Sequence, residues 1–294
     1  MISSFTRSFL ASAALAGAGW LAATAGVAAQ EVTLRLHQFL PAQANVPANL
    51  LYPWADRVEA ASGGRIRIER YPAMQLGGTP PQLIDQAQDG TVDIVWTLPG
   101  YTPGRFPTTE VFELPFIMTN AEATSKAYWD LFEAHMKDGE FAGVHMIATW
   151  VHGPGAIHAN RAVGKLEDLR GMKVRAPGIP AYVTSIAALG VNPTSIAFEE
   201  TYAALQQGVV DGLEQPLVAI KDHRFFEVAK HLVVTNHMAE TMAFICNAPW
   251  YAGLDAPVKT AFETAADASA DWYRAYTQES SQQLIGELQA NGLV

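Results

Sequence analysis

The chain has 294 residues, a formal net charge of −10 and one cysteine, Cys246. The acidic balance argues against nucleic acids and anionic membranes as partners. A single cysteine excludes an intramolecular disulfide and a multi-cysteine zinc site, so burial of apolar side chains must stabilise the fold. The length suits two compact domains or one large domain.

The N-terminus predicts export. Residues 1–29 contain one charged side chain, Arg7, followed by an apolar run rich in small residues. Val27-Ala28-Ala29 fits the small-x-small rule, which predicts signal-peptide cleavage after Ala29. The apolar run is long enough to make a membrane anchor the alternative. No later segment predicts a membrane span, so we expect a soluble periplasmic protein.

Periodicity predicts the elements in chain order. The first half is expected to contain strands at 32–37, 66–71, 92–98 and 144–151, and helices at 45–62, 80–89 and 122–135. The second half is expected to contain strands at 157–160, 173–175, 209–214, 231–236 and 242–247, a turn at 192–193, and helices at 180–189, 199–207 and 257–289. Strands that alternate with helices predict parallel sheets with crossover helices.

Two such series without a flexible linker predict an α/β protein of two lobes that the chain crosses several times. We expect residues 30–152 and 241–280 in lobe I, and 153–240 and 281–294 in lobe II. The last predicted helix exceeds ordinary helix length, so it could brace more than one domain.

One arginine stands out in the segment GMKVRAPG, residues 171–178. Arg175 ends a short alternating strand and precedes a Pro-Gly turn. In α/β proteins, ligands bind at the carboxyl ends of strands, and a guanidinium matches a carboxylate with its rigid fork of donors. An arginine paired with a surface acid is the alternative, and the spacing alone does not decide between them.

Six motifs follow one another in a familiar order. They are SGGRIRIERYPAMQLGG (62–78), QAQDGTVDI (86–94), ELPF (113–116), LEDLRGMKVRAPG (166–178), EETYAALQQGVVDGLEQP (199–216) and FFEVAKHLVVTNH (225–237). With these motifs the chain resembles the extracytoplasmic solute-binding proteins of tripartite ATP-independent periplasmic (TRAP) transporters, the DctP-like family. The resemblance covers nearly all of the chain after residue 33.

The resemblance implies a two-lobed periplasmic solute-binding protein fold, with crossing strands and a long bracing helix, that closes over a small organic acid. The family's carboxylate-binding arginine matches Arg175. Gln215 stands where many members have an asparagine ligand contact, and Glu214 lies in the cleft region, although a structural acid is an equal alternative. The second arginine of sialic-acid-type members falls near Gly155, which argues against sialic acid.

Five further residues are candidates for the pocket. His152 follows a strand and precedes a glycine loop, where it could act as a neutral donor. Trp150 and Tyr101 lie near predicted strand ends, and Gln38 and Phe39 follow the first strand. Strand-end aromatics can line an apolar pocket, but core packing is the usual role of aromatic residues. The histidine spacing matches no metal motif, so we expect neither a metal nor a cofactor.

We interpret the chain as a TRAP solute receptor without a catalytic step, and expect a monomer that delivers its ligand to membrane permease subunits. The expected ligand is a small monocarboxylate with hydroxyl, keto or aromatic substituents. One alternative is a ligand sensor for a two-component system, and nothing in the chain distinguishes such a sensor from a transport receptor. An exported metal- or carbohydrate-acting enzyme is the other, although no catalytic motif supports it.

The C-terminus is also notable. Family members usually continue for some tens of residues past the long helix, so we expect a truncated C-terminus. On that basis four apolar side chains should be partly uncovered: Leu284, Ile285, Leu288 and Leu293.

Overall fold

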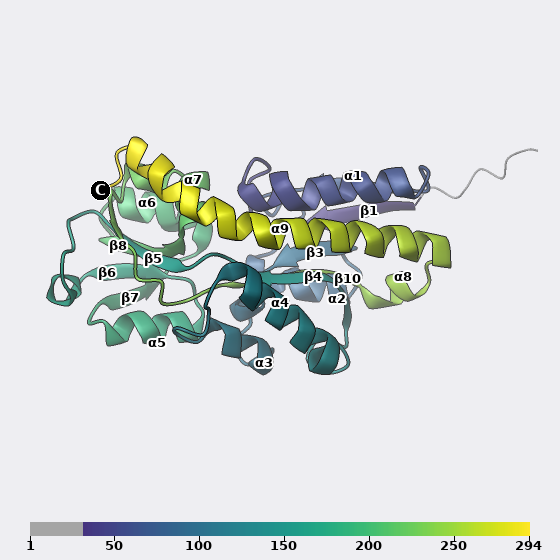
Figure 1. The fold of residues 1–294 in the computed structure, drawn as a ribbon, viewed down its shortest axis with the longest axis horizontal. Coiled ribbons are helices and arrows are strands. Elements are labelled where there is room, and N and C mark those ends of the chain that lie inside the picture. Colours follow the sequence, from purple (N-terminus) through teal and green to yellow (C-terminus); the bar gives the residue numbers. More distant parts are fainter. Residues whose placement is uncertain (1–31) are drawn as a thin grey trace, which may run out of the picture. The chain divides into compact units, whose positions relative to one another are not determined.

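The computed structural model describes residues 32–294, apart from the side chains of Gln278 and Gln282. The predicted signal peptide and its cleavage site lie outside the described residues. Two five-stranded sheets, each flanked by helices, form the described part of the chain (Figure 1). Both sheets are mixed, so the prediction of parallel sheets holds only for some of their strands.

The first sheet joins segments that are far apart in sequence. Its order is β2 (Ile66–Tyr71), β1 (Val32–His37), β3 (Ile94–Thr97), β10 (Thr241–Asn247) and β4 (Val144–Val151). Strand β1 pairs in parallel with β2 and β3, as predicted. Strand β10 lies between β3 and β4 and runs antiparallel to both. This insertion makes the sheet mixed, and no local sequence pattern indicates it.

The second sheet has the order β7 (Asn192–Ser195), β6 (Lys173–Ala176), β8 (Gly212–Pro216), β5 (Gly155–Ala159) and β9 (His231–Val233). Strand β6 pairs in parallel with β7 and β8, whereas β5 is antiparallel to β8 and β9. The prediction of a turn at 192–193 is wrong, because these residues begin β7. An edge strand tolerates Pro193, since its missing N–H removes no bond from the sheet interior.

The helices cover the sheets and connect the strands. They are α1 (Tyr52–Ala61), α2 (Leu83–Gln88), α3 (Pro107–Glu110), α4 (Ala121–Leu131), α5 (Pro180–Ala188), α6 (Thr201–Gln206), α7 (Leu217–Asp222), α8 (Ala248–Ala252) and α9 (Ala256–Ala290). Helices α3, α7 and α8 were not predicted. Short 3-10 turns follow several strands, and two of them, Pro99–Tyr101 and Phe198–Glu200, supply residues to the site below.

Helix α9 is the predicted bracing helix, and the structure confirms it. Its first half packs Phe262 and Tyr273 into the core of the first sheet, and its second half packs Leu284 and Leu288 against the second sheet (Figure 1). No helix within residues 32–294 is both long and apolar enough to cross a membrane.

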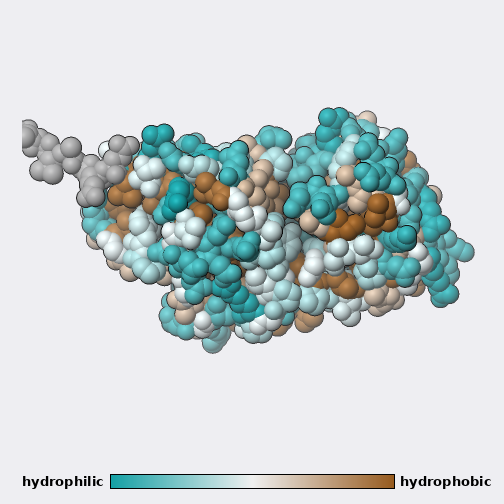
Figure 2. Space-filling view, turned by 180° about the vertical axis from the view of Figure 1, so that it is seen from behind, coloured by the Kyte–Doolittle hydropathy of each residue, from teal (hydrophilic) through white to brown (hydrophobic). Residues whose placement is uncertain are grey.

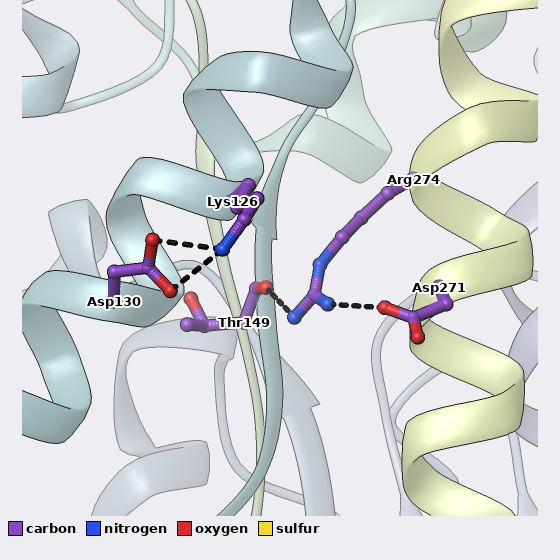
Figure 3. Close-up of polar contacts among 5 residues, drawn as sticks. All are labelled: Lys126, Asp130, Thr149, Asp271 and Arg274. Carbon is purple, nitrogen blue, oxygen red and sulfur yellow. Dashed lines mark hydrogen bonds and ion pairs between the residues drawn. The ribbon is translucent and has the colours of Figure 1, made fainter.

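A side chain of α9 also holds the first sheet near the point where the chain leaves it. Arg274 donates to the backbone oxygen of Thr149 in β4 at 3.1 Å and to Asp271, one turn earlier in α9, at 2.9 Å (Figure 3). Lys126 and Asp130 form a separate ion pair on α4. Strand β4 is therefore fixed to α9 two residues before its end.

The chain crosses between the sheets at three places: after β4, between β9 and β10, and along α9. The first two crossings are bonded to each other. The His152 N–H donates to the Glu240 oxygen at 3.0 Å, and the Gly155 N–H donates to the Met238 oxygen at 2.7 Å. These segments bring His152 and Glu240 to the boundary between the sheets. The assignment of residues to two lobes stays a prediction.

The predicted exposure at the C-terminal end is wrong for three of the four side chains. Leu284, Leu288 and Leu293 are buried in one cluster with residues of β8, α6 and α7, and Ile285 is half-buried. The backbone of Val294 pairs with the segment at β9: its N–H donates to the Lys230 oxygen and its oxygen accepts from Leu232, both at 2.8 Å. The helical periodicity indicated which apolar side chains share a face of α9, but it could not indicate that α6 and α7 cover that face.

The face of the molecule opposite to that in Figure 1 is mainly hydrophilic. Apolar residues gather there in separate areas, with hydrophilic side chains covering the surface around them (Figure 2). This distribution suits an acidic chain whose apolar side chains are largely buried in four clusters.

Candidate ligand-binding site

Two neighbouring hollows lie between the sheets. The outer groove has a volume of about 340 Å³ and is lined by Pro80, Pro81, Tyr101, Arg175, Gly178, Ser195, Ile196, Ala197, Phe198 and Glu199. The inner cavity has a volume of about 30 Å³ and is lined by Phe39, Leu40, Val46, Trp96, Leu98, Tyr101, His152, Phe198, Gln215, Val218, Ala219, Asp222, His223, Glu240 and Met242. Tyr101 and Phe198 belong to both, so they form a shared wall.

The shared wall has one side chain from each sheet. Tyr101 lies on the 3-10 turn that follows β3, and Phe198 lies on the turn that follows β7. Phe39, which follows β1, contacts both rings at centroid distances of 5.8 and 6.0 Å and stacks on Trp96 at 4.9 Å. Aromatic side chains from three strand ends therefore surround one point between the sheets.

Arg175 lies beside this wall near the end of β6 and is only 1% exposed. Its Nε donates to the Ile196 oxygen at 3.1 Å, and its guanidinium carbon lies 5.6 Å from the centre of the Phe198 ring. The Nη1 atom is buried and has no hydrogen-bond partner among the described residues. A buried guanidinium with an unused donor is suited to binding an anion.

Two buried carboxyl groups, Glu214 and Glu240, interact with the charge of Arg175, and a third, Glu113, interacts with Glu240. Burial raises the pKa of Glu240 to about 7, and Arg175 opposes that rise. Burial, and then the charge of Glu240, raise the pKa of Glu214 well above its usual value, against the effect of Arg175. Burial also raises the pKa of Glu113 to about 7, although its bonds with Thr241 lower it. Near pH 7, Glu240 and Glu113 are therefore protonated in about half of the molecules, which reduces their competition for the guanidinium charge.

The inner cavity contains polar atoms that lack partners. The Trp96 Nε1, His152 Nδ1, Gln215 Nε2 and His223 Nε2 atoms are buried and make no hydrogen bond within residues 32–294. Burial lowers the pKa of both histidines to about 4, so their rings are neutral at neutral pH. Buried polar groups usually have partners, so four unpartnered ones at a single cavity indicate a place for a ligand.

The comparisons with known proteins decide the family. The model of the family described as bacterial extracellular solute-binding protein, family 7 (DctP) matches residues 39–294. The chain belongs to this family. It is an extracytoplasmic solute-binding protein of the TRAP type, a family that is periplasmic, and the resemblance drawn from the six motifs is confirmed.

Two solved structures and one curated relative are similar to this TRAP solute-binding protein. A TRAP solute-binding protein from Rhodoferax ferrireducens, in complex with copurified benzoate, is 37% identical with a TM-score of 0.81, over 88% of this chain and 82% of that one. A marine metagenome protein specific for aromatic acids, with 3-hydroxybenzoate, is 34% identical with a TM-score of 0.76, over 90% and 89%. The C4-dicarboxylate-binding protein DctP of Rhodobacter capsulatus is 30% identical, over 80% and 71%.

The structure of this TRAP solute-binding protein brings five of the predicted site residues to the two hollows: Phe39, Tyr101, His152, Arg175 and Gln215. Their roles as ligand contacts stay predictions.

The other three predicted residues line neither hollow. Trp150 packs against Tyr273 at 5.6 Å, and the side-chain amide of Gln38 bonds to the backbone of Leu40. The carboxyl group of Glu214 lies so close to Gly155 in β5 that any side chain at position 155 would collide with it.

Sequence reasoning missed several lining residues, among them Phe198, Asp222, His223 and Glu240. Phe198 follows β7, which was mistaken for a turn, so its position at a strand end could not be inferred. Asp222 and His223 lie at the end of α7, which was not predicted. Glu240 directly precedes the apolar strand β10. An acidic residue next to a buried strand was the only sequence feature that could have marked it as a site residue.

Within residues 32–294, no group of three or more histidine, cysteine, aspartate and glutamate side chains is arranged to hold a metal ion. Cys246 is a buried free thiol in β10.

Proposed function

We propose that this TRAP solute-binding protein is a receptor that binds a small aromatic monocarboxylate between its two sheets and delivers it to membrane permease subunits. The observation that carries the proposal is the buried guanidinium of Arg175, with its unused Nη1 donor, beside the Tyr101–Phe198 wall. The predicted signal peptide and the periplasmic family support a task outside the cytoplasm.

A carboxylate is the anion that Arg175 fits best. Guanidinium and carboxylate groups pair through two parallel charge-assisted hydrogen bonds, which fix orientation as well as affinity. The bond from Nε to Ile196 already orients the guanidinium plane. Burial raises the pKa of the neighbouring acids Glu214 and Glu240, so they compete less with an incoming carboxylate than fully ionised acids would.

The remainder of the ligand is proposed to be an aromatic ring. Phe39, Trp96, Tyr101 and Phe198 offer ring faces and edges that favour offset or edge-on contacts with another ring. The benzoate and 3-hydroxybenzoate named for the two similar structures support this class of ligand. Gly155 lies near the position at which sialic-acid-type members have a second arginine. Its presence supports a ligand that is held by one arginine only.

A thermal-shift screen after native mass spectrometry tests the proposal. Benzoate and 3-hydroxybenzoate should raise the melting temperature, whereas benzyl alcohol, which keeps the ring and lacks the carboxylate, should not. At a free ligand concentration about 100 times Kd, the added stability is about 2.7 kcal/mol. If citrate or sialic acid stabilised the protein and no aromatic acid did, the proposal would be wrong.

A further inference from the structure

The inner cavity is too small for a second ring and large enough for a substituent. Its volume of about 30 Å³ gives room for one or two water-sized groups, since each requires at least about 10 to 15 Å³. It shares the Tyr101–Phe198 wall with the outer groove that Arg175 lines. A ligand ring between these two side chains would therefore join the two hollows. A ring lying at the wall would then direct a substituent into the cavity.

Hydrogen-bond donors in the cavity favour an oxygen atom. The indole N–H of Trp96 and the amide Nε2 of Gln215 can only donate, and neither has a partner among the described residues. Both side chains are at most 2% exposed. The neutral rings of His152 and His223 can each donate or accept, depending on the tautomer. An apolar substituent would leave all of these groups without partners, which costs binding energy.

Acidic groups in the cavity decide which kind of oxygen fits. Glu240 and Asp222 both line it, and Asp222 is engaged with the Asn45 N–H at 2.6 Å. The charge of Arg175 acts on Glu240, but Arg175 lines the outer groove and is assigned there to the ligand carboxylate. A hydroxyl group can donate to an acid and accept from Trp96. A second carboxylate can only accept, and it would add a negative charge beside two acids.

We propose that the inner cavity is a subsite for one neutral oxygen substituent, a hydroxyl or keto group on the ring, and that Glu240 excludes a second carboxylate from it. The ligand is thereby narrowed from aromatic monocarboxylates to those that carry a hydroxyl or keto group opposite the clamped carboxylate. This inference rests on the proposed function, because it assumes that Arg175 holds the first carboxylate.

Calorimetry with three ligands of one shape tests the inference: benzoate, 4-hydroxybenzoate and terephthalate. The wild-type protein should bind 4-hydroxybenzoate about 10- to 100-fold more tightly than benzoate, because the unused donors gain a partner. Terephthalate, which has a carboxylate in place of the hydroxyl, should bind more weakly than benzoate. Gln215→Leu should reduce the preference for 4-hydroxybenzoate over benzoate.

The variant Glu240→Gln keeps the shape of the side chain and cannot carry a negative charge. Above pH 7, where Glu240 of the wild type is mostly ionised, it should improve the binding of terephthalate by about tenfold or more. Glu200→Gln is the matched control, because Glu200 is an exposed acid next to the outer groove that lines neither hollow. It should change none of the three affinities.

The outcomes separate the two proposals. If benzoate binds but terephthalate binds as tightly as 4-hydroxybenzoate, or if the two glutamine variants behave alike, the subsite inference is overturned and the proposed function stands. If none of the three acids binds, both are overturned. Melting curves of each variant without ligand confirm that it is folded before its affinity is compared.

Discussion

Arg175 shows how a charged side chain can be buried and still remain available. Its strand position places it between the sheets, and the Ile196 oxygen takes one of its donors. The Phe198 ring covers the guanidinium on one side. The unused Nη1 donor is held in place before any ligand arrives, which lowers the entropy cost of binding.

Arg175→Ala should therefore weaken ligand binding more than any other single substitution in the site. Truncating one partner of a buried charged pair costs about 2 to 5 kcal/mol, which corresponds to roughly 30-fold to several thousandfold in Kd. Arg175→Lys should restore little, because an ammonium group keeps the charge but lacks the planar fork. Calorimetry with the best ligand of the screen measures all three proteins.

Arg161 and Arg170 are the internal controls. Both are exposed, and Arg161 bonds to the Asp168 oxygen on the loop before β6. Their alanine variants should bind the ligand as the wild type does. Equal affinities for all three alanine variants would mean that Arg175 is a structural arginine.

Glu240 gives a prediction about pH. Burial raises its pKa from a usual 4.5 to about 7, so the folded protein keeps this proton over a range in which the unfolded chain loses it. Where the folded state binds more protons, the free energy of unfolding falls as pH rises. The wild type should therefore lose stability through this group between about pH 4.5 and pH 7, on the order of 3 kcal/mol at about 1.4 kcal/mol per pKa unit.

Glu240→Gln cannot lose that proton, so its stability relative to the wild type should increase as pH rises through this range. Urea unfolding of both proteins at several pH values measures the difference between their free energies of unfolding. The contribution of the buried histidines cancels in this difference, because both proteins contain them. A difference for Glu240→Gln that does not change with pH would contradict the raised pKa.

The sequence could indicate some side chains of the site and not others. Arg175 was recognisable because a strand and a Pro-Gly turn bracket it, and the resemblance matched it to a known ligand contact. Phe198 and Glu240 were not recognisable, since their places depend on which strands become neighbours. Trp150 has the same strand-end signal as the pocket aromatics, yet it packs on α9, because local sequence does not show which face of β4 meets that helix.

Secondary-structure elements followed local pattern closely where alternation was clear. The bounds of β1, β2 and β4 agree with the predicted ranges, because apolar residues alternate regularly within them. Strand β7 was missed because its second residue is Pro193, which also marks turns. The antiparallel insertion of β10 into the first sheet depends on pairing across about 150 residues, which no short-range signal encodes.

The C-terminal end of α9 should contribute strongly to stability. Leu288 is buried against residues of α6 and α7, so Leu288→Ala should cost about 2 to 5 kcal/mol through lost burial and the cavity left behind. Gln289→Ala changes the next residue, which is exposed, and should stay within about 0.5 kcal/mol of the wild type. Urea unfolding measures both, and equal stabilities would show that this end of the helix is not part of the cooperative fold.

At the scale of the molecule, the described residues form two sheets that contact each other near the site, largely through aromatic side chains. Ile179 and Tyr182, at α5 of the second sheet, reach the core cluster of the first sheet, and Asn45 donates to Asp222 across the boundary. The crossing segments are bonded to each other at His152–Glu240 and Gly155–Met238. The two crossing segments and helix α9 would therefore carry any change in the angle between the sheets.

Ligand binding should therefore make the molecule more compact. The proposed ligand touches Arg175 on one sheet and Trp96 on the other, so it makes all its contacts only when the sheets are close, and a ligand favours the state that it binds better. Small-angle X-ray scattering should show a smaller radius of gyration with saturating ligand than without it. Arg175→Ala should show no decrease at the same ligand concentration, because it lacks the clamp. An identical scattering profile for the wild type with and without bound ligand would mean that the sheets are already closed, and that the ligand enters by movement of the Tyr101 and Phe198 side chains alone.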